Sequence, residues 1–167
     1  MTKLNHIDTA RYGVIAGAAG GLAEIAWITL YAGITGGNAA ILARGVTTAV
    51  GVNALFSTAS AAFGVAIHMT LAVLLGIALA FAWRAVSSRR SALVNPFSFA
   101  LAALLGVWAV NFLVVLPIVS PAFVHAVPYA ISLTSKLLFG LAAAMVLRRY
   151  GVSALNARTV PAAARAS

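Results

Sequence analysis

Long apolar stretches alternate with short polar breaks along the chain, and this pattern gives the first indication of its architecture. A transmembrane helix needs about 20 mostly apolar residues. Four stretches reach this length, running from about Tyr12 to Gly33, Ala61 to Trp83, Phe97 to Val119 and Val127 to Leu147. Arginine or proline residues separate the last three stretches. The pattern predicts an all-α membrane protein, with a four-transmembrane-helix bundle forming a single domain over residues 1–149.

The segment from Ile34 to Ser60 is also apolar, but its polar positions follow a helical period. Residues three and four apart lie on the same face of a helix, and this spacing relates Arg44, Thr47, Thr48 and Gly51. A fifth span here would place Lys3 and Arg11 outside, against the tendency of basic residues to stay in the cytoplasm. We expect an amphipathic or re-entrant outer helix entered through Gly36-Gly37. The sequence leaves open whether this segment is interfacial, re-entrant or spanning.

Composition supports the membrane assignment and gives it an orientation. The chain is 63% hydrophobic and 8% charged, with 11 basic and 2 acidic residues, whereas a soluble domain is about 25% charged. With four spans, nine basic residues fall on one side: Lys3, Arg11, Arg84, Arg89, Arg90, Arg148, Arg149, Arg158 and Arg165. The positive-inside rule then predicts that both termini lie in the cytoplasm. Residues 150–167 are expected to form a basic cytoplasmic tail.

The net charge of +9 is therefore explained by topology, and we expect no nucleic-acid partner. The expected partners are the lipid bilayer and its anionic headgroups, and a lipid-facing basic set is predicted to contact them: Arg84, Arg89, Arg90, Arg148 and Arg149. Trp83, beside this set, is expected to be an interfacial anchor. A homo-oligomer and a larger membrane complex both remain open. The absence of cysteine excludes disulfides and thiol catalysis.

One strongly polar residue occurs in each predicted span, at a similar depth. These residues are Glu24, His68, Asn111 and Lys136. Each lies about 11–13 Å from the outer end of its helix, at about 1.5 Å of rise per residue. Polar residues inside a membrane are costly and often functional. They are predicted to form an intramembrane polar layer that faces the interior of the bundle.

This polar layer has two interpretations. In the first, Glu24 and Lys136 form a structural ion pair, because an unpaired buried charge is expensive, and His68 and Asn111 satisfy the remaining hydrogen bonds. In the second, the layer carries protons, binds an ion or holds a small polar molecule.

Other chemistry has less support in the sequence. Ser132, Thr134 and Ser135 lie close to Lys136, but hydroxyl groups in transmembrane helices more often bond to backbone or to a neighbouring helix. A non-enzymatic role is therefore favoured over an enzyme. His125 has no metal-ligand spacing to other histidines or acids, so no metal site and no cofactor are expected.

The layout over most of residues 12–149 resembles the YagU-like group of small bacterial inner-membrane proteins. The resemblance is carried by Gly13-Val14-Ile15-Ala16-Gly17, Glu24, His68, Leu116-Pro117 and Arg148-Arg149. It implies a multi-span protein linked to acid tolerance. The last two predicted helices lack the histidine expected in that group.

A second resemblance covers about one helix. Leu22-Ala23-Glu24-Ile25, followed by Thr29-Leu30, is similar to the first helix of small multidrug-resistance exporters. It implies that Glu24 couples protons to a cationic substrate. The long segment from Ile34 to Ser60 and the intramembrane Lys136 depart from that family.

The sequence as a whole favours a small polytopic inner-membrane protein that acts within or beside a membrane complex. The alternative is a proton-linked small transporter or channel that uses Glu24, His68 and Lys136.

Overall fold

The computed structural model describes residues 6–49, 61–89 and 95–159, and almost all of these residues are helical. The elements are α1 (His6–Thr35), α2 (Ala39–Ala49), α3 (Ala61–Arg89), α4 (Pro96–Val110), a π-helical segment η2 (Asn111–Val115), α5 (Leu116–Val119), α6 (Pro121–Ala126) and α7 (Tyr129–Thr159). No strand occurs within these three ranges. The prediction of an all-α protein is confirmed for them.

Four helical stretches are long and apolar enough to cross a membrane. They cover His6–Thr35, Ala61–Ser87, Pro96–Val119 and Tyr129–Arg149. The third stretch combines α4, η2 and α5 into one continuous rod. The four stretches match the four predicted spans, although the first begins earlier than the hydropathy pattern indicated.

Local sequence signals explain where several helices begin and end. Gly36 adopts a left-handed φ of 67°, and the next amide, of Gly37, donates to the carbonyl of Ala32 at 2.8 Å. This glycine-dependent cap ends α1. The Asn95 side chain caps α4 by accepting from the Phe97 amide at 2.9 Å, with Pro96 in the first helical position.

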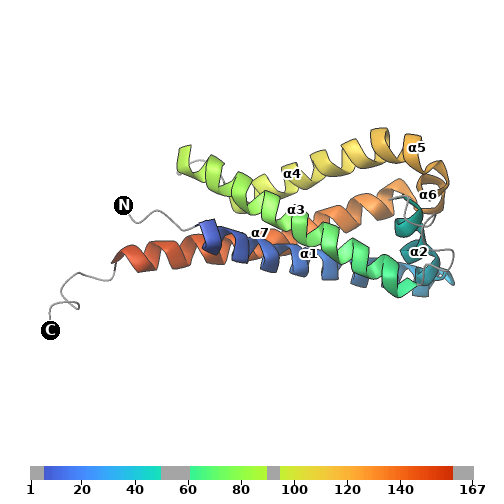
Figure 1. The fold of residues 1–167 in the computed structure, drawn as a ribbon, viewed down its shortest axis with the longest axis horizontal. Helices are drawn as coiled ribbons and strands as arrows, with labels where there is room; N and C mark the ends of the chain where they lie inside the picture. Colours follow the sequence, from blue (N-terminus) through green and yellow to red (C-terminus); the bar gives the residue numbers. More distant parts are fainter. Residues whose placement is uncertain (1–5, 50–60, 90–94, 160–167) are drawn as a thin grey trace.

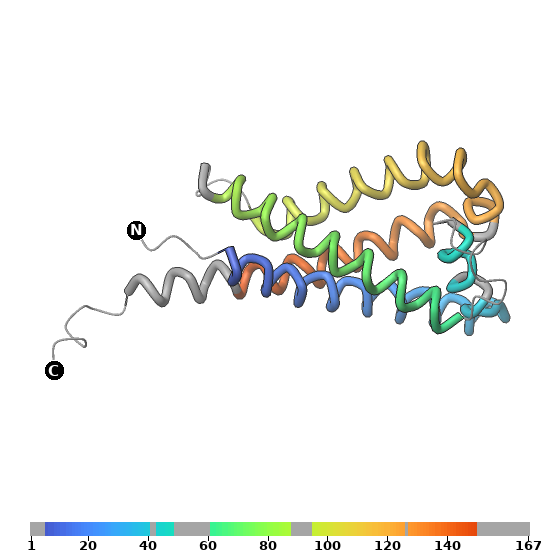
Figure 2. The backbone as a smooth tube through the Cα atoms, viewed as in Figure 1, coloured from blue at the N-terminus to red at the C-terminus, as the bar shows by residue number. Residues whose placement is uncertain are grey.

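Helix α1 lies centrally, with α3 along one side and α7 along another, while α4 packs on α7. In Figure 2, α7 lies beside α1 near the start of α1, and the two helices diverge toward the other end of α1. Glycines permit the contact between α1 and α3. A side chain at Gly13 would meet the Ile77 backbone, and one at Gly17 would meet the Ala72 and Val73 backbones. Small residues allow such close helix approach in membranes, where apolar side chains gain little by leaving lipid.

The main packed core lies toward the end of the molecule where α1 begins. It joins side chains from all four long helices, including Ala16, Leu79, Leu104, Phe139 and Leu147. Trp83 belongs to this core; it is 8% exposed and packs on Phe99 with ring centroids 5.4 Å apart. The expectation that Trp83 is an interfacial anchor is therefore wrong.

The predicted lipid-facing basic residues lie in different surroundings. Arg84 is half-buried, and its Nη1 donates to Oγ1 of the buried Thr9 at 3.2 Å, so it joins α3 to α1. Arg148 and Arg149 are exposed on α7. Arg89 ends α3. Arg90 lies outside the described residues, as do 50–60 of the predicted outer segment and 160–167 of the predicted tail.

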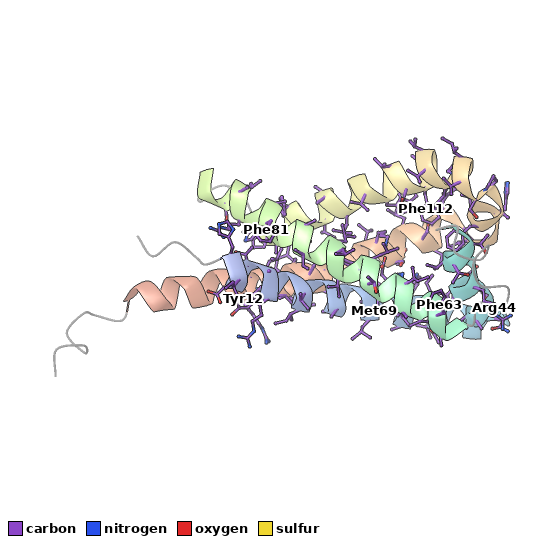
Figure 3. All side chains as sticks on the ribbon, in the orientation of Figure 1. Tyr12, Arg44, Phe63, Met69, Phe81 and Phe112 are labelled. Atoms are coloured by element: carbon purple, nitrogen blue, oxygen red, sulfur yellow. The ribbon has the colours of Figure 1, made fainter. Side chains whose placement is uncertain are left out.

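The short elements α2, α5 and α6 gather at the end of the molecule opposite the start of α1 (Figure 1). Helix α2 packs so closely on α3 that a side chain at Gly64 would collide with the Ala43 backbone. Its Gly45 faces the Phe123 ring of α6. Arg44, on the exposed face of α2, lies far from Tyr12 near the start of α1 (Figure 3). Thr47 is buried, so it does not share the exposed face with Arg44 and Thr48.

Candidate functional site: a buried carboxylate beside an apolar cavity

Glu24 is the centre of the candidate site. It lies on α1 and is 2% exposed. Two glycines of α1 lie one turn before Glu24. Gly20 rests against the Phe139 ring of α7, and Gly21 rests against Ala72 and Met69 of α3. The carboxylate is therefore placed where α1 lies between two neighbouring helices and has no access to lipid.

One carboxylate oxygen of Glu24 is fully engaged by α7. Lys136 Nζ lies 2.6 Å from Oε1, and Ser135 Oγ donates to the same oxygen at 3.1 Å. The Lys136 ammonium also lies 5.8 Å from the centroid of the Phe139 ring, within the range of a cation–π contact. These contacts make Glu24 and Lys136 a neutral pair inside the membrane-spanning part of the fold.

The second carboxylate oxygen has a different environment. His68 Nε2 of α3 lies 3.5 Å from Glu24 Oε2, longer than the usual 2.7–3.2 Å of such a hydrogen bond. Both atoms are buried and have no hydrogen-bond partner. Leaving a buried polar atom unsatisfied is costly, more so for a charged group. This oxygen and this nitrogen therefore have unused capacity to bind a proton or a polar ligand.

A cavity of about 320 Å³ adjoins these two groups. Glu24, His68 and Ser135 line it together with Thr29. The rest of its wall is apolar and comes from α1, α2, α3 and the loop before α7: Ile25, Ile28, Ala39, Ala40, Ala43, Val46, Ala61, Gly64, Val65 and Val127. For scale, an apolar cavity of about 150 Å³ can bind benzene. The cavity therefore has room for a molecule of about two rings.

The structure brings together three of the four residues of the predicted polar layer. Glu24, His68 and Lys136 meet across α1, α3 and α7. Asn111 does not join them: it is exposed and begins η2. The side chain that faces inward at this place is its neighbour Phe112, which is buried and stacks on Trp108 at 6.1 Å between ring centroids. Residue spacing gave the depth of Asn111 but not the direction of its side chain.

The hydroxyl groups near Lys136 have separate roles. Ser132 accepts from Trp108 Nε1 at 3.0 Å and donates to the Tyr129 carbonyl at 2.9 Å. Thr134 bonds to the Ala130 carbonyl at 2.8 Å. Ser135 alone of the three contacts Glu24. Sequence reasoning did not place Ser135 in the site, because 111 residues separate it from Glu24. The available signal was that Ser135 is adjacent to Lys136.

The structure offers no clear metal-binding group. Within residues 6–49, 61–89 and 95–159, no three His, Cys, Asp or Glu side chains are grouped to hold an ion. His125 is exposed on α6 and does not line the cavity. The site is thus a carboxylate, an ammonium, an imidazole and a hydroxyl beside apolar space.

In comparisons with known proteins, no family model matches the chain, and neither a curated protein nor a solved structure matches it. The function must therefore be argued from the site.

Proposed function

We propose that this protein is a proton-linked carrier that exchanges protons for small, mainly apolar molecules, using Glu24, His68 and Lys136. The observation that carries the proposal is the buried, unpartnered Oε2 of Glu24, a residue that lines the cavity. A purely structural polar layer would be expected to satisfy both carboxylate oxygens and to leave no adjoining space.

Proton coupling follows from the geometry of this oxygen. A proton that arrives on His68 Nε2 can be shared with Glu24 Oε2, since the two atoms are already 3.5 Å apart. A ligand that binds Oε2 uses the same lone pairs and must displace that proton. Because proton and ligand compete for one oxygen, binding of either reduces binding of the other, which is the thermodynamic requirement for exchange.

Lys136 and Ser135 keep the carboxylate ready for this competition. They hold Oε1 at 2.6 Å and 3.1 Å and so leave Oε2 on the side of His68 without a hydrogen-bond partner. Lys136 also neutralises the buried charge, which would otherwise be too costly to keep in the membrane. The resemblance of Leu22-Ala23-Glu24-Ile25 to exporter helices agrees with a coupling role for Glu24 and is part of the proposal.

The test is proton movement in proteoliposomes that contain a pH-indicating dye. After a pH step, the wild-type protein should accelerate the internal pH change when at least one of a panel of small apolar compounds is present. Glu24→Gln, reconstituted in equal amount, should lose this acceleration. Rates equal to those of empty liposomes with every compound would contradict the carrier function.

We also propose that the protein lies in a bacterial inner membrane with both termini in the cytoplasm. Nine basic residues on one side of the spans support this orientation, and the exposed Arg148 and Arg149 are suited to anionic headgroups. Because the chain has no cysteine, Asp8→Cys and Asn38→Cys report the two ends of α1. An impermeant maleimide should label Asn38→Cys in intact cells and Asp8→Cys only after lysis; the reverse pattern would invert the orientation.

A second candidate function is a subunit within or beside a membrane complex, including a homo-oligomer. The exposed amide of Asn111 supports it, because an amide inside a span gains by hydrogen bonding to another helix. Purification in native lipid should then yield a stable assembly that Asn111→Leu weakens. A monomer that Asn111→Leu leaves unchanged would remove this candidate.

A further inference from the structure

We infer that the ligand of the cavity is an uncharged, mainly apolar molecule that carries a hydrogen-bond donor at one end, such as an alcohol or a phenol. The inference rests on the proposed function, because it assigns the ligand to the same Glu24 oxygen. It adds the chemical class of the ligand, which the competition with protons alone does not determine.

The need for a donor follows from the unsatisfied atoms. Glu24 Oε2 is a buried acceptor without a partner, and a carboxylate accepts hydrogen bonds but cannot donate them. A hydroxyl group at this end of the cavity would donate to Oε2. One donor would therefore satisfy the orphaned oxygen, and it would replace the proton that His68 otherwise shares with that oxygen.

The absence of net charge follows from the ion pair. Glu24 is already balanced by Lys136 at 2.6 Å, so a cationic ligand would bring an uncompensated positive charge into a low-dielectric site. The chain has two acidic residues in all, and the other, Asp8, lies near the start of α1, about 24 Å away along the helix. An anionic ligand would meet the carboxylate itself. Both charged classes are disfavoured, which separates this site from a site for cationic drugs.

The apolar body of the ligand follows from the walls. Alanine, valine and isoleucine side chains from α1, α2 and α3 form most of the lining, and they offer a ligand contacts but no hydrogen bonds. The volume of about 320 Å³ suits a two-ring body. A molecule of this class would also dissolve in the lipid that surrounds the helices.

A matched set of naphthalene compounds tests the inference on the full-length protein in lipid nanodiscs. The set is 2-naphthol, 2-methoxynaphthalene and 2-(aminomethyl)naphthalene, and the last is cationic at neutral pH. Binding is measured by equilibrium dialysis at one pH, with empty nanodiscs subtracted. We expect 2-naphthol to bind at least about tenfold more tightly than 2-methoxynaphthalene, which lacks the donor, and the amine to show no saturable binding.

Two variants locate the binding. Ala40→Phe fills the cavity from α2 while leaving Glu24, His68 and Lys136 unsubstituted, and it should reduce 2-naphthol binding by about tenfold or more. Ala102→Phe makes the same change on the exposed surface of α4 and should leave binding unchanged. Thermal unfolding of both variants verifies that they remain folded.

The inference is overturned if the methyl ether or the amine binds as tightly as 2-naphthol, if no compound binds above empty nanodiscs, or if folded Ala40→Phe binds like the wild type. These outcomes are independent of transport, because no proton gradient is applied. Binding of 2-naphthol without proton flux would reject only the carrier function. Proton flux with preferred binding of the amine would reject only the ligand class.

Discussion

The two ends of the α1–α3–α7 assembly share these three helices but are packed by opposite means. Toward the start of α1, glycines bring α1 and α3 into backbone contact, and the core is filled by alanine, leucine and aromatic side chains. Toward the end of α1, the helices enclose a charged pair, an orphaned oxygen and a cavity. The first end is filled by protein side chains, and the second leaves space for a ligand.

The two ends differ because of a few residues on α1. Gly13 and Gly17 carry no Cβ and allow the α3 backbone to touch α1. About two turns later, Glu24 and Trp27 face α7 with large side chains, and Trp27 Nε1 donates to the Ile131 carbonyl at 3.1 Å. Close packing is the main attraction between helices in lipid. Close packing at the packed end therefore holds the three helices together, whereas the open end, with its cavity, makes fewer such contacts.

The largest effect should come from breaking the charge balance at the open end. Lys136→Met leaves the carboxylate of Glu24 buried without its cation, and removing one partner of a buried ion pair costs about 3–5 kcal/mol. We expect the free energy of unfolding in mixed micelles to fall by about this amount. Adding Glu24→Gln to Lys136→Met should recover most of the loss, because no unpaired charge then remains, yet proton flux should stay absent. A double variant less stable than Lys136→Met would show that charge balance does not stabilise this end.

At the packed end, an added side chain should be nearly as damaging. Gly17→Leu places carbon atoms against the Ala72 and Val73 backbones, which cannot rotate away as a side chain can. Overpacking costs about 1–3 kcal/mol, and we expect a loss near the upper limit. The matched control is Gly106→Leu on α4, where no atom lies within 4 Å of the added Cβ position. Equal stability of Gly17→Leu and Gly106→Leu would refute backbone contact between α1 and α3.

A smaller effect should come from the hydrogen bond that joins α1 to α7 near the open end. Trp27→Phe removes the donor to the Ile131 carbonyl but keeps an aromatic ring. The loss of one such bond costs about 1 kcal/mol. We expect thermal unfolding a few degrees below the wild type, while proton flux persists. A complete loss of flux in folded Trp27→Phe would mean that this bond positions the site and does more than stabilise it.

The smallest effect should come from partly filling the cavity. Ala40→Leu adds apolar contacts where space exists, and cavity filling commonly stabilises a protein by about 0.5–2 kcal/mol. We expect a gain at the lower limit, measured as the free energy of unfolding. Ala102→Leu, on the exposed surface of α4, should give no gain. Destabilisation by Ala40→Leu alone would show that this end is already as tightly packed as the other.

The apolar pattern was sufficient to predict the four long helices, because about 20 apolar residues in a row have few alternatives to a membrane span. Depth arithmetic was sufficient to place Glu24, His68 and Lys136 at one level. It could not give the rotation of each helix about its axis, and for that reason it misplaced Asn111. Trp83 was assigned to the interface from its residue type, but the close approach of α3 to its neighbours places it in the core.

The cavity was beyond sequence reasoning because it is defined by what is missing between elements. Its wall comes from segments as distant as Ile25 and Ser135, and no local pattern reports the space between them. The contact of α2 with Gly64 also depends on a meeting of backbones. The sequence signal for this contact was the pair of small residues Ala39 and Ala43, one turn apart on α2, which is typical of a helix that packs closely on its neighbour.

The π-helical segment η2 has a consequence for the ancestry of the chain. A π-turn contains one residue more than an α-turn. A helix that gained one residue within Asn111–Val115 could therefore keep the residues on both sides of this segment facing their original directions. In this chain, Leu104 before the segment stays in the core, and Phe112 within it turns to the aromatic group of Trp108 and Tyr129. We expect relatives with a regular helix here to align with a one-residue gap between Asn111 and Val115.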